Sequence, residues 1–162
     1  MSGFRKALTL FVTVAVLATV FAAAVPAQAH GPQGCTPGYW KNHLDAWLAL
    51  APDSALGGVP ATPNTLVGQM FPLPAAYSEL ADDTLLDALR YGGGPGLIGA
   101  AKILLRAAVA SRLNEFHPGV EFADGGVVSS VVYHALVTND RQQILSIATY
   151  WDNRNNAGCP LN

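Results

Sequence analysis

The chain has 162 residues, of which 51% are hydrophobic and only 12% are charged, and its formal net charge is −2. Globular domains usually carry about 25% charged residues, so this composition excludes a charge-rich disordered chain. Nine Lys and Arg residues stand against eleven Asp and Glu residues. That balance provides no polycationic surface, and we expect no nucleic-acid partner.

Residues 1–29 have the pattern of a secretory signal peptide. Two basic residues precede an uncharged apolar run over 7–25, and Pro26-Ala27-Gln28-Ala29 supplies the small residues that a signal peptidase reads. We expect cleavage after Ala29, which leaves a mature domain over 30–162; a retained membrane anchor is the alternative. No second long apolar run follows. The pattern therefore predicts a secreted, cell-surface or periplasmic protein whose mature chain has no transmembrane span.

If the chain is exported, its two cysteines are expected to form a disulfide. Cys35 lies close to the expected new N-terminus, and Cys159 lies three residues before the end of the chain. In an oxidising compartment an even pair favours a disulfide, and we predict one between them. Two free thiols are the alternative, while a zinc site is disfavoured because neither cysteine belongs to a C-x-x-C pair.

The first predicted helix begins at Thr36-Pro37, an N-cap followed by proline at the first helical position. Its apolar stripe is expected to run on to a stop at Pro52. The members of that stripe are Trp40, His43, Leu44, Trp47, Leu48 and Ala51. Five prolines and three glycines then make 52–76 a long irregular loop, whose apolar residues indicate that it lies on the core.

The second half of the chain predicts further helices. Asp82 or Asp83 caps a short one, and the glycine-rich segment 92–96 separates it from a long Ala- and Leu-rich helix over 97–116. The valine-rich segment 127–137 fits either a strand or a helix, and Asp140 caps a final helix. We therefore predict a mainly α fold, a single compact domain of about five helices with a long Pro-rich loop.

Several of these segments resemble a family of exported bacterial proteins, most of them uncharacterised. The similar segments are Cys35-Thr36-Pro37-Gly38-Tyr39-Trp40-Lys41-Asn42-His43, then 83–89, 99–110, and 152–156 with Gly158-Cys159-Pro160-Leu161. The resemblance covers almost all of 30–162 in order, and its first motif is the most specific. It implies an exported helical domain, and it carries no catalytic residue because the family has no established activity.

The densest set of candidate binding residues lies in that first motif. Tyr39, Trp40 and Trp47 could form a stacking platform for sugar rings, with Asn42 and His43 as polar contacts. The structural interpretation makes Trp40 and Trp47 core anchors, with His43 hydrogen-bonded between them. We favour the structural interpretation.

Histidines supply the one metal site that we keep as an alternative. Cleavage after Ala29 would give His30 a free α-amine beside its imidazole, which resembles the copper-binding N-terminus of certain polysaccharide oxygenases. A second histidine would come from His43, His117 or His134. Those oxygenases are β-sandwiches, so copper is kept only as an alternative and no cofactor is predicted. His117 is expected at a helix end, favoured by the dipole, and His134 as a packed or half-exposed helix residue.

Function is weakly constrained by these patterns. We expect an exported, non-enzymatic interaction or structural domain with an unknown extracellular or cell-surface partner, and no catalytic residues. The alternatives are a small extracellular copper-dependent or carbohydrate-active protein, and a helical pocket for a small apolar ligand.

Overall fold

The computed structural model describes residues 31–50, 60–122 and 126–162. The predicted signal peptide, His30, Ala51 of the first predicted helix and the part of the Pro-rich loop over 52–59 lie outside the described residues.

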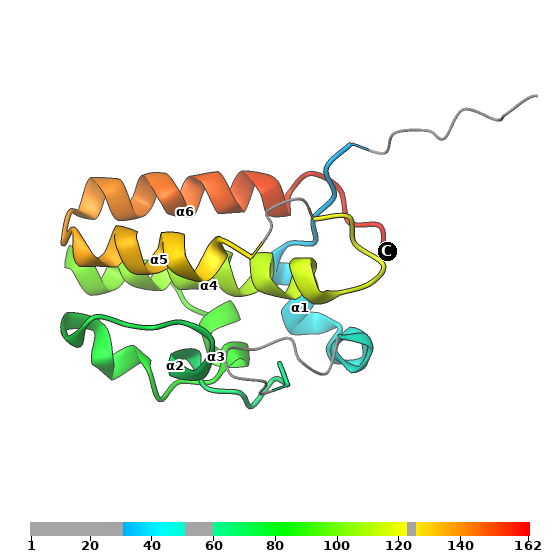
Figure 1. The fold of residues 1–162 in the computed structure, drawn as a ribbon, viewed down its shortest axis with the longest axis horizontal. Helices are drawn as coiled ribbons and strands as arrows, with labels where there is room; N and C mark the ends of the chain where they lie inside the picture. The colour runs from blue at the N-terminus through cyan, green and yellow to red at the C-terminus, as the bar shows by residue number, and fades with distance from the viewer. Residues whose placement is uncertain (1–30, 51–59, 123–125) are drawn as a thin grey trace, which may run out of the picture.

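Three helices of ten or more residues contain most of the helical residues that the structure describes. These are α4 (Gly96–Phe116), α5 (Val128–Val137) and α6 (Arg141–Asn155). They run alongside one another, with α5 directed opposite to both α4 and α6 (Figure 1). Parallel α4 and α6 therefore bring their C-terminal turns to the same end of the molecule.

The central helix is α4, which is buried on almost every side. Leu104, Leu105 and Leu113 are fully buried, and small residues such as Ala107 and Ala108 lie beside them. Small side chains allow neighbouring helices to approach closely, and α6 packs along α4 more extensively than any other helix does. Lys102 and Arg106, two of the charged residues of this helix, are half-buried.

Short helices cover the other side of α4 (Figure 1). In chain order they are α1 (Pro37–Asn42), the 3₁₀ helix η1 (Leu44–Ala49), α2 (Val67–Met70), the 3₁₀ helix η3 (Ala75–Leu80) and α3 (Leu85–Leu89). The described part of the predicted 52–76 loop therefore contains α2 and the start of η3. Its residues Val67, Met70 and Phe71 are fully buried, as expected for a segment that lies on the core.

The prediction of one continuous first helix is wrong, because the helix is interrupted at His43 between α1 and η1. In a continuous α-helix the Trp40 carbonyl would accept from the N–H of residue 44. Here it accepts from the indole N–H of Trp47 at 3.0 Å instead. The tighter 3₁₀ turn redirects the apolar stripe, so Leu44 and Leu48 are exposed.

The other predicted helix starts are confirmed in one case and differ in another. Thr84, and not Asp82 or Asp83, caps α3, because its hydroxyl accepts from the Asp87 N–H at 3.1 Å. The ambiguous 127–137 segment is helical, and Asp140 caps α6 as predicted, accepting from the N–H groups of Gln142 and Gln143.

The mainly α prediction is confirmed. The described ranges contain six α-helices and two 3₁₀ helices, more than the predicted number of about five, because the first predicted helix is divided in two and α2 and η3 were not predicted. Within these same ranges, none of the helices has the length and apolar character needed to cross a membrane.

Candidate functional site

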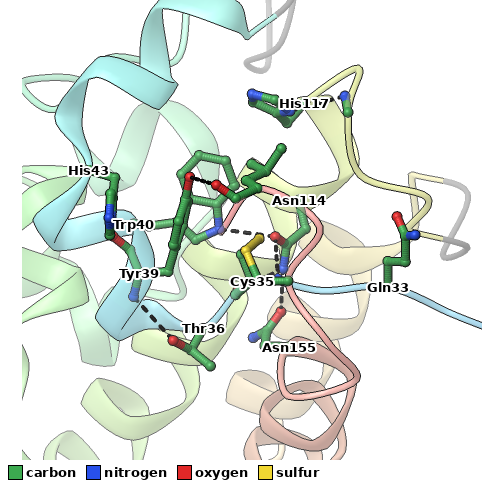
Figure 2. Close-up of a disulfide and its surroundings, with 12 residues drawn as sticks. Gln33, Cys35, Thr36, Tyr39, Trp40, His43, Asn114, His117 and Asn155 are labelled. Atoms are coloured by element: carbon green, nitrogen blue, oxygen red, sulfur yellow. Dashed lines mark hydrogen bonds between the residues drawn. A yellow bond between two sulfur atoms is a disulfide. The ribbon is translucent and has the colours of Figure 1, made fainter.

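The two ends of the described chain are joined by the predicted disulfide, between Cys35 and Cys159 (Figure 2). Beside it the Gly34 N–H donates to the Gly158 carbonyl at 3.0 Å. A Cβ at Gly34 would collide with the Arg154 carbonyl, so only glycine lets this extended segment pass so close to the end of α6. The disulfide prediction is confirmed.

A buried asparagine lies at the centre of the same region. The Asn114 side-chain oxygen accepts from the Cys35 N–H at 2.8 Å and from the Trp40 indole N–H at 3.0 Å. Its amide nitrogen donates to the Cys35 carbonyl and to the Asn155 side-chain oxygen, both at 2.9 Å. Figure 2 shows Asn114 between Cys35, Trp40 and Asn155. One side chain thus connects α4, α6, α1 and the disulfide.

Asn155, the last residue of α6, extends this network along α4. Its oxygen also accepts from the Ser111 hydroxyl at 3.1 Å, and its nitrogen donates to the Ala107 carbonyl at 2.9 Å. A buried polar side chain is tolerated when its donors and acceptors are paired, and these pairs meet that condition.

The aromatic residues of the first motif lie mainly in the core. Trp40 is fully buried and Trp47 is 4% exposed, and their rings meet edge to face at 6.3 Å between centroids. Tyr39 is half-buried and donates its hydroxyl to the Leu161 carbonyl at 3.4 Å. Burial first and the Asp45 carboxylate second raise the pKa of Tyr39, which keeps the phenol protonated as a donor.

His43 does not lie between the two tryptophans, and that expectation is wrong. It is exposed at the C-terminus of α1, where its ring stacks on Tyr39 at 4.2 Å between centroids (Figure 2). Its Nδ1 lies 2.9 Å from the Tyr39 carbonyl. Asn42 is exposed beside it. Whether Tyr39, Asn42 or His43 contacts a ligand stays a prediction.

His117 occupies the predicted helix end, as the C-cap of α4. It is buried near the Trp40 ring, and its Nδ1 accepts from the Gly119 N–H at 3.0 Å. Burial lowers the pKa of His117, so the neutral ring is favoured here over the charged ring that would interact with the helix dipole.

The copper hypothesis depends on residues that the structure leaves apart or does not describe. His30 lies outside the described residues, His43 and His134 are exposed, and His117 is buried. Among residues 31–50, 60–122 and 126–162, no group of three or more His, Cys, Asp or Glu side chains could hold a metal.

A cleft of about 330 Å³ opens beside the N-terminus of α1. It lies where α1, the end of α3, the middle of α4 and the end of α6 meet. Its lining residues are Thr36, Pro37, Gly38, Lys41, Leu89, Arg90, Tyr91, Arg106, Asp152 and Asn156. Three of these side chains are cationic and one is anionic. The motif around Trp40 thus contributes Lys41 to an open cleft while its tryptophans lie in the core.

A second hollow of about 90 Å³ shares Arg106 and Asp152 with this cleft. Its other lining residues are Ile103, Ala107, Ala148 and Thr149. We call the two together the basic cleft. The larger hollow is lined mainly by polar and charged residues, and the smaller one is lined by three apolar and three polar or charged residues.

Sequence reasoning missed Asn114, Arg90 and Arg106 as members of any site. The one available signal was the position of Asn114 inside a strongly apolar helix, where a polar residue requires partners. Arg90 and Arg106 carried no such signal, because charged residues on helices usually face solvent.

Comparison with protein-family models, with curated proteins and with solved structures found no match for this chain. The resemblance to exported bacterial proteins therefore stays a prediction from the motifs.

Proposed function

We propose that this chain is exported, and that its mature part is a disulfide-closed helical domain that acts by binding and not by catalysis. The observation that carries the proposal is that residues 35–43 contribute both to the core and to an open cleft. Cys35 and Trp40 close the fold through Asn114 and Cys159, while Lys41 faces the basic cleft. A segment that anchors the core and also lines an open cleft suits a rigid recognition surface.

The disulfide supports the exported location. Such bonds persist in oxidising compartments and are rare in reducing ones, and this one closes a separation of 124 residues. The N-terminal pattern of basic residues, apolar run and Ala-x-Ala site supports the same location.

The fixed charges of the cleft support binding. Lys41, Arg90 and Arg106 are donors that can hold an anionic group. Such residues recognise and orient a ligand without a bond being made or broken.

Export is tested by producing the full chain, with its own N-terminal segment, in a host with an oxidising periplasm. We expect an exported species with the mass of residues 30–162 less two hydrogens. An Ala29→Phe variant should keep the N-terminal segment, because signal peptidase requires a small residue there. Wild-type protein found in the cytoplasm at full length would contradict the proposal.

The second half of the proposal is tested on the exported protein with each compound that it binds. The compound should be recovered unchanged after prolonged incubation. Conversion that disappears in an Arg106→Gln variant would overturn the non-catalytic assignment.

A further inference from the structure

The basic cleft concentrates positive charge in an acidic domain. Residues 30–162 hold seven Lys and Arg residues against eleven Asp and Glu residues. Three of those seven cations, Lys41, Arg90 and Arg106, line this one cleft, with Asp152 as its single carboxylate. In a chain of net negative charge, such a gathering creates a local positive potential.

The Arg106 side chain is held in place by a hydrogen bond to the backbone of Tyr91. It is half-buried, and its Nη1 donates to the Tyr91 carbonyl at 3.2 Å. Tyr91 is itself fixed, because its hydroxyl donates to the Asp83 carboxylate at 2.5 Å. Burial and this hydrogen bond raise the pKa of Tyr91, so the phenol stays a donor. The bond to Tyr91 uses one of the five N–H groups of a guanidinium, and the rest can serve a ligand.

Two cations outside the cleft, Arg112 and Lys102, have structural contacts. Arg112 pairs with Glu115 at 2.5 Å and lies over the Phe116 ring at 4.0 Å. Lys102 lies over the Tyr91 ring at 5.4 Å. Within the cleft, Arg90 has only a long contact of 3.9 Å to Asp87, and more than half of each side chain is exposed. An exposed ion pair of this kind is weak, so the Arg90 guanidinium can reorient from Asp87 toward an anionic ligand.

The size of the cleft limits the ligand. Ligand pockets usually start at about 300 Å³, so a chamber of about 330 Å³ suits a molecule near the size of one sugar ring. The adjoining hollow offers Ile103 and two alanines beside the Thr149 hydroxyl, which suits a ring with both apolar and hydroxylated edges.

Resting on the proposed binding function, we propose that the basic cleft binds a sugar-sized organic anion, whose carboxylate or phosphate is held by Arg106 with Lys41 and Arg90. The planar guanidinium matches both groups by paired N–H donors. Asp152 lies at the junction of the two hollows, where it can accept from a ligand hydroxyl.

Calorimetric titration of the exported, disulfide-bonded protein tests the proposal. Galacturonate is the carboxylate probe, glucose 6-phosphate is the phosphate probe, and glucose is the neutral control. We expect saturable binding of at least one anion and none of glucose, and the stronger anion identifies the charged group recognised.

Three variants locate the binding. Arg106→Gln and Lys41→Gln should each lower the affinity for the anion by about 10-fold or more, which is the loss expected for one charge-assisted hydrogen bond. Arg141→Gln removes the same charge from an exposed position at the start of α6, outside the cleft, and should bind like wild type. Lys41 is exposed, so its variant keeps the test valid if Arg106→Gln lowers stability.

Three results would overturn the cleft assignment: no binding of either anion, equal loss in Arg141→Gln, or glucose bound as well as galacturonate. Failure of the cleft is distinguishable from failure of the proposed function. An exported protein that binds neither anion contradicts only the cleft, while an anion that binds in the cleft and is converted contradicts only the non-catalytic function.

Discussion

Asn114 shows how one polar side chain can organise an apolar core. Its four hydrogen bonds reach Cys35 twice, Trp40 once and Asn155 once. Because this amide satisfies both backbone groups of Cys35, it fixes the segment that carries the disulfide and begins α1. The position of Lys41 at the cleft follows from that placement.

We predict that Asn114→Ala lowers the free energy of unfolding by about 3 kcal/mol or more, because several buried donors and acceptors lose their partner at once. Asn42→Ala is the matched control, since that amide is exposed in the same motif, and it should change stability by less than about 0.5 kcal/mol. Urea unfolding of both variants measures the difference. Equal effects would show that the network contributes little.

His117 makes stability depend on pH. The folded state favours the neutral imidazole, whose Nδ1 accepts from Gly119, so its pKa is lowered by burial. The unfolded chain takes up a proton near its ordinary pKa of about 6.5. Between the two pKa values the unfolded state binds more protons, so stability is complete above the unfolded value and falls as pH decreases.

We therefore expect the wild-type free energy of unfolding to fall between pH 7.5 and pH 5, and His117→Asn to reduce that fall. His134→Asn is the control, because His134 is exposed on α5, and it should keep the wild-type pH dependence. Denaturant titrations at several pH values measure all three proteins. A His117→Asn variant with the full wild-type fall would assign the dependence to other groups.

At the scale of elements, close backbone approach decides how the short helices meet α4. The chain turns from α3 into α4 through Gly92-Gly93-Gly94-Pro95-Gly96, and Gly96 has a φ of 70°, which favours glycine. Gly99, in the first turn of α4, is buried against the Gly94 backbone. This contact places Arg90 and Tyr91 against the side of α4 that carries Arg106.

Gly99→Ala is expected to lower the free energy of unfolding by about 1–3 kcal/mol, since its Cβ would collide with the Gly94 carbonyl and force the turn outward. Gly92→Ala has open space around the added Cβ, so it should be neutral or stabilising by up to about 1 kcal/mol. Thermal unfolding of the pair checks the direction. If Gly99→Ala melts like wild type, the turn is more adaptable than the packing indicates.

For the whole molecule, the disulfide and the parallel α4 and α6 act together. Because α5 reverses the chain between them, the C-terminal ends of α4 and α6 lie at the same end of the molecule (Figure 1). The Cys35–Cys159 bond lies there too, because Asn114 of α4 is hydrogen-bonded to both Cys35 and Asn155 of α6. The bridge therefore joins segments that the helix packing already brings together.

Removing the bridge with Cys35→Ala and Cys159→Ala should lower the free energy of unfolding by up to about 5 kcal/mol, because the unfolded chain loses a long closed loop. For a domain of this size the full loss corresponds to a fall in Tm of roughly 10–20 °C. Adding a reductant to wild type should reproduce the fall and leave the double variant unaffected. A Tm that is insensitive to both changes would mean that the Asn114 network alone holds the ends.

Local spacing in the sequence was enough to predict the mainly α class, the long helix over 97–116, the caps at Thr36 and Asp140, and the pairing of the only two cysteines. Each of these depends on a few neighbouring residues or on a unique pair. The break at His43 was missed because the Trp40 carbonyl accepts from the Trp47 side chain and not from a backbone N–H, and the spacing of apolar residues carries no sign of such a bond.

Only the tertiary structure decided which polar residues are buried and where the cleft forms. Asn114 meets Cys35 across 79 positions, and Lys41, Arg90, Arg106 and Asp152 come from four separate elements or their ends. Local patterns fix the face and the ends of one helix at a time. The meeting of distant side chains depends on how the helices pack, because packing sets which faces are hidden and which gaps remain open.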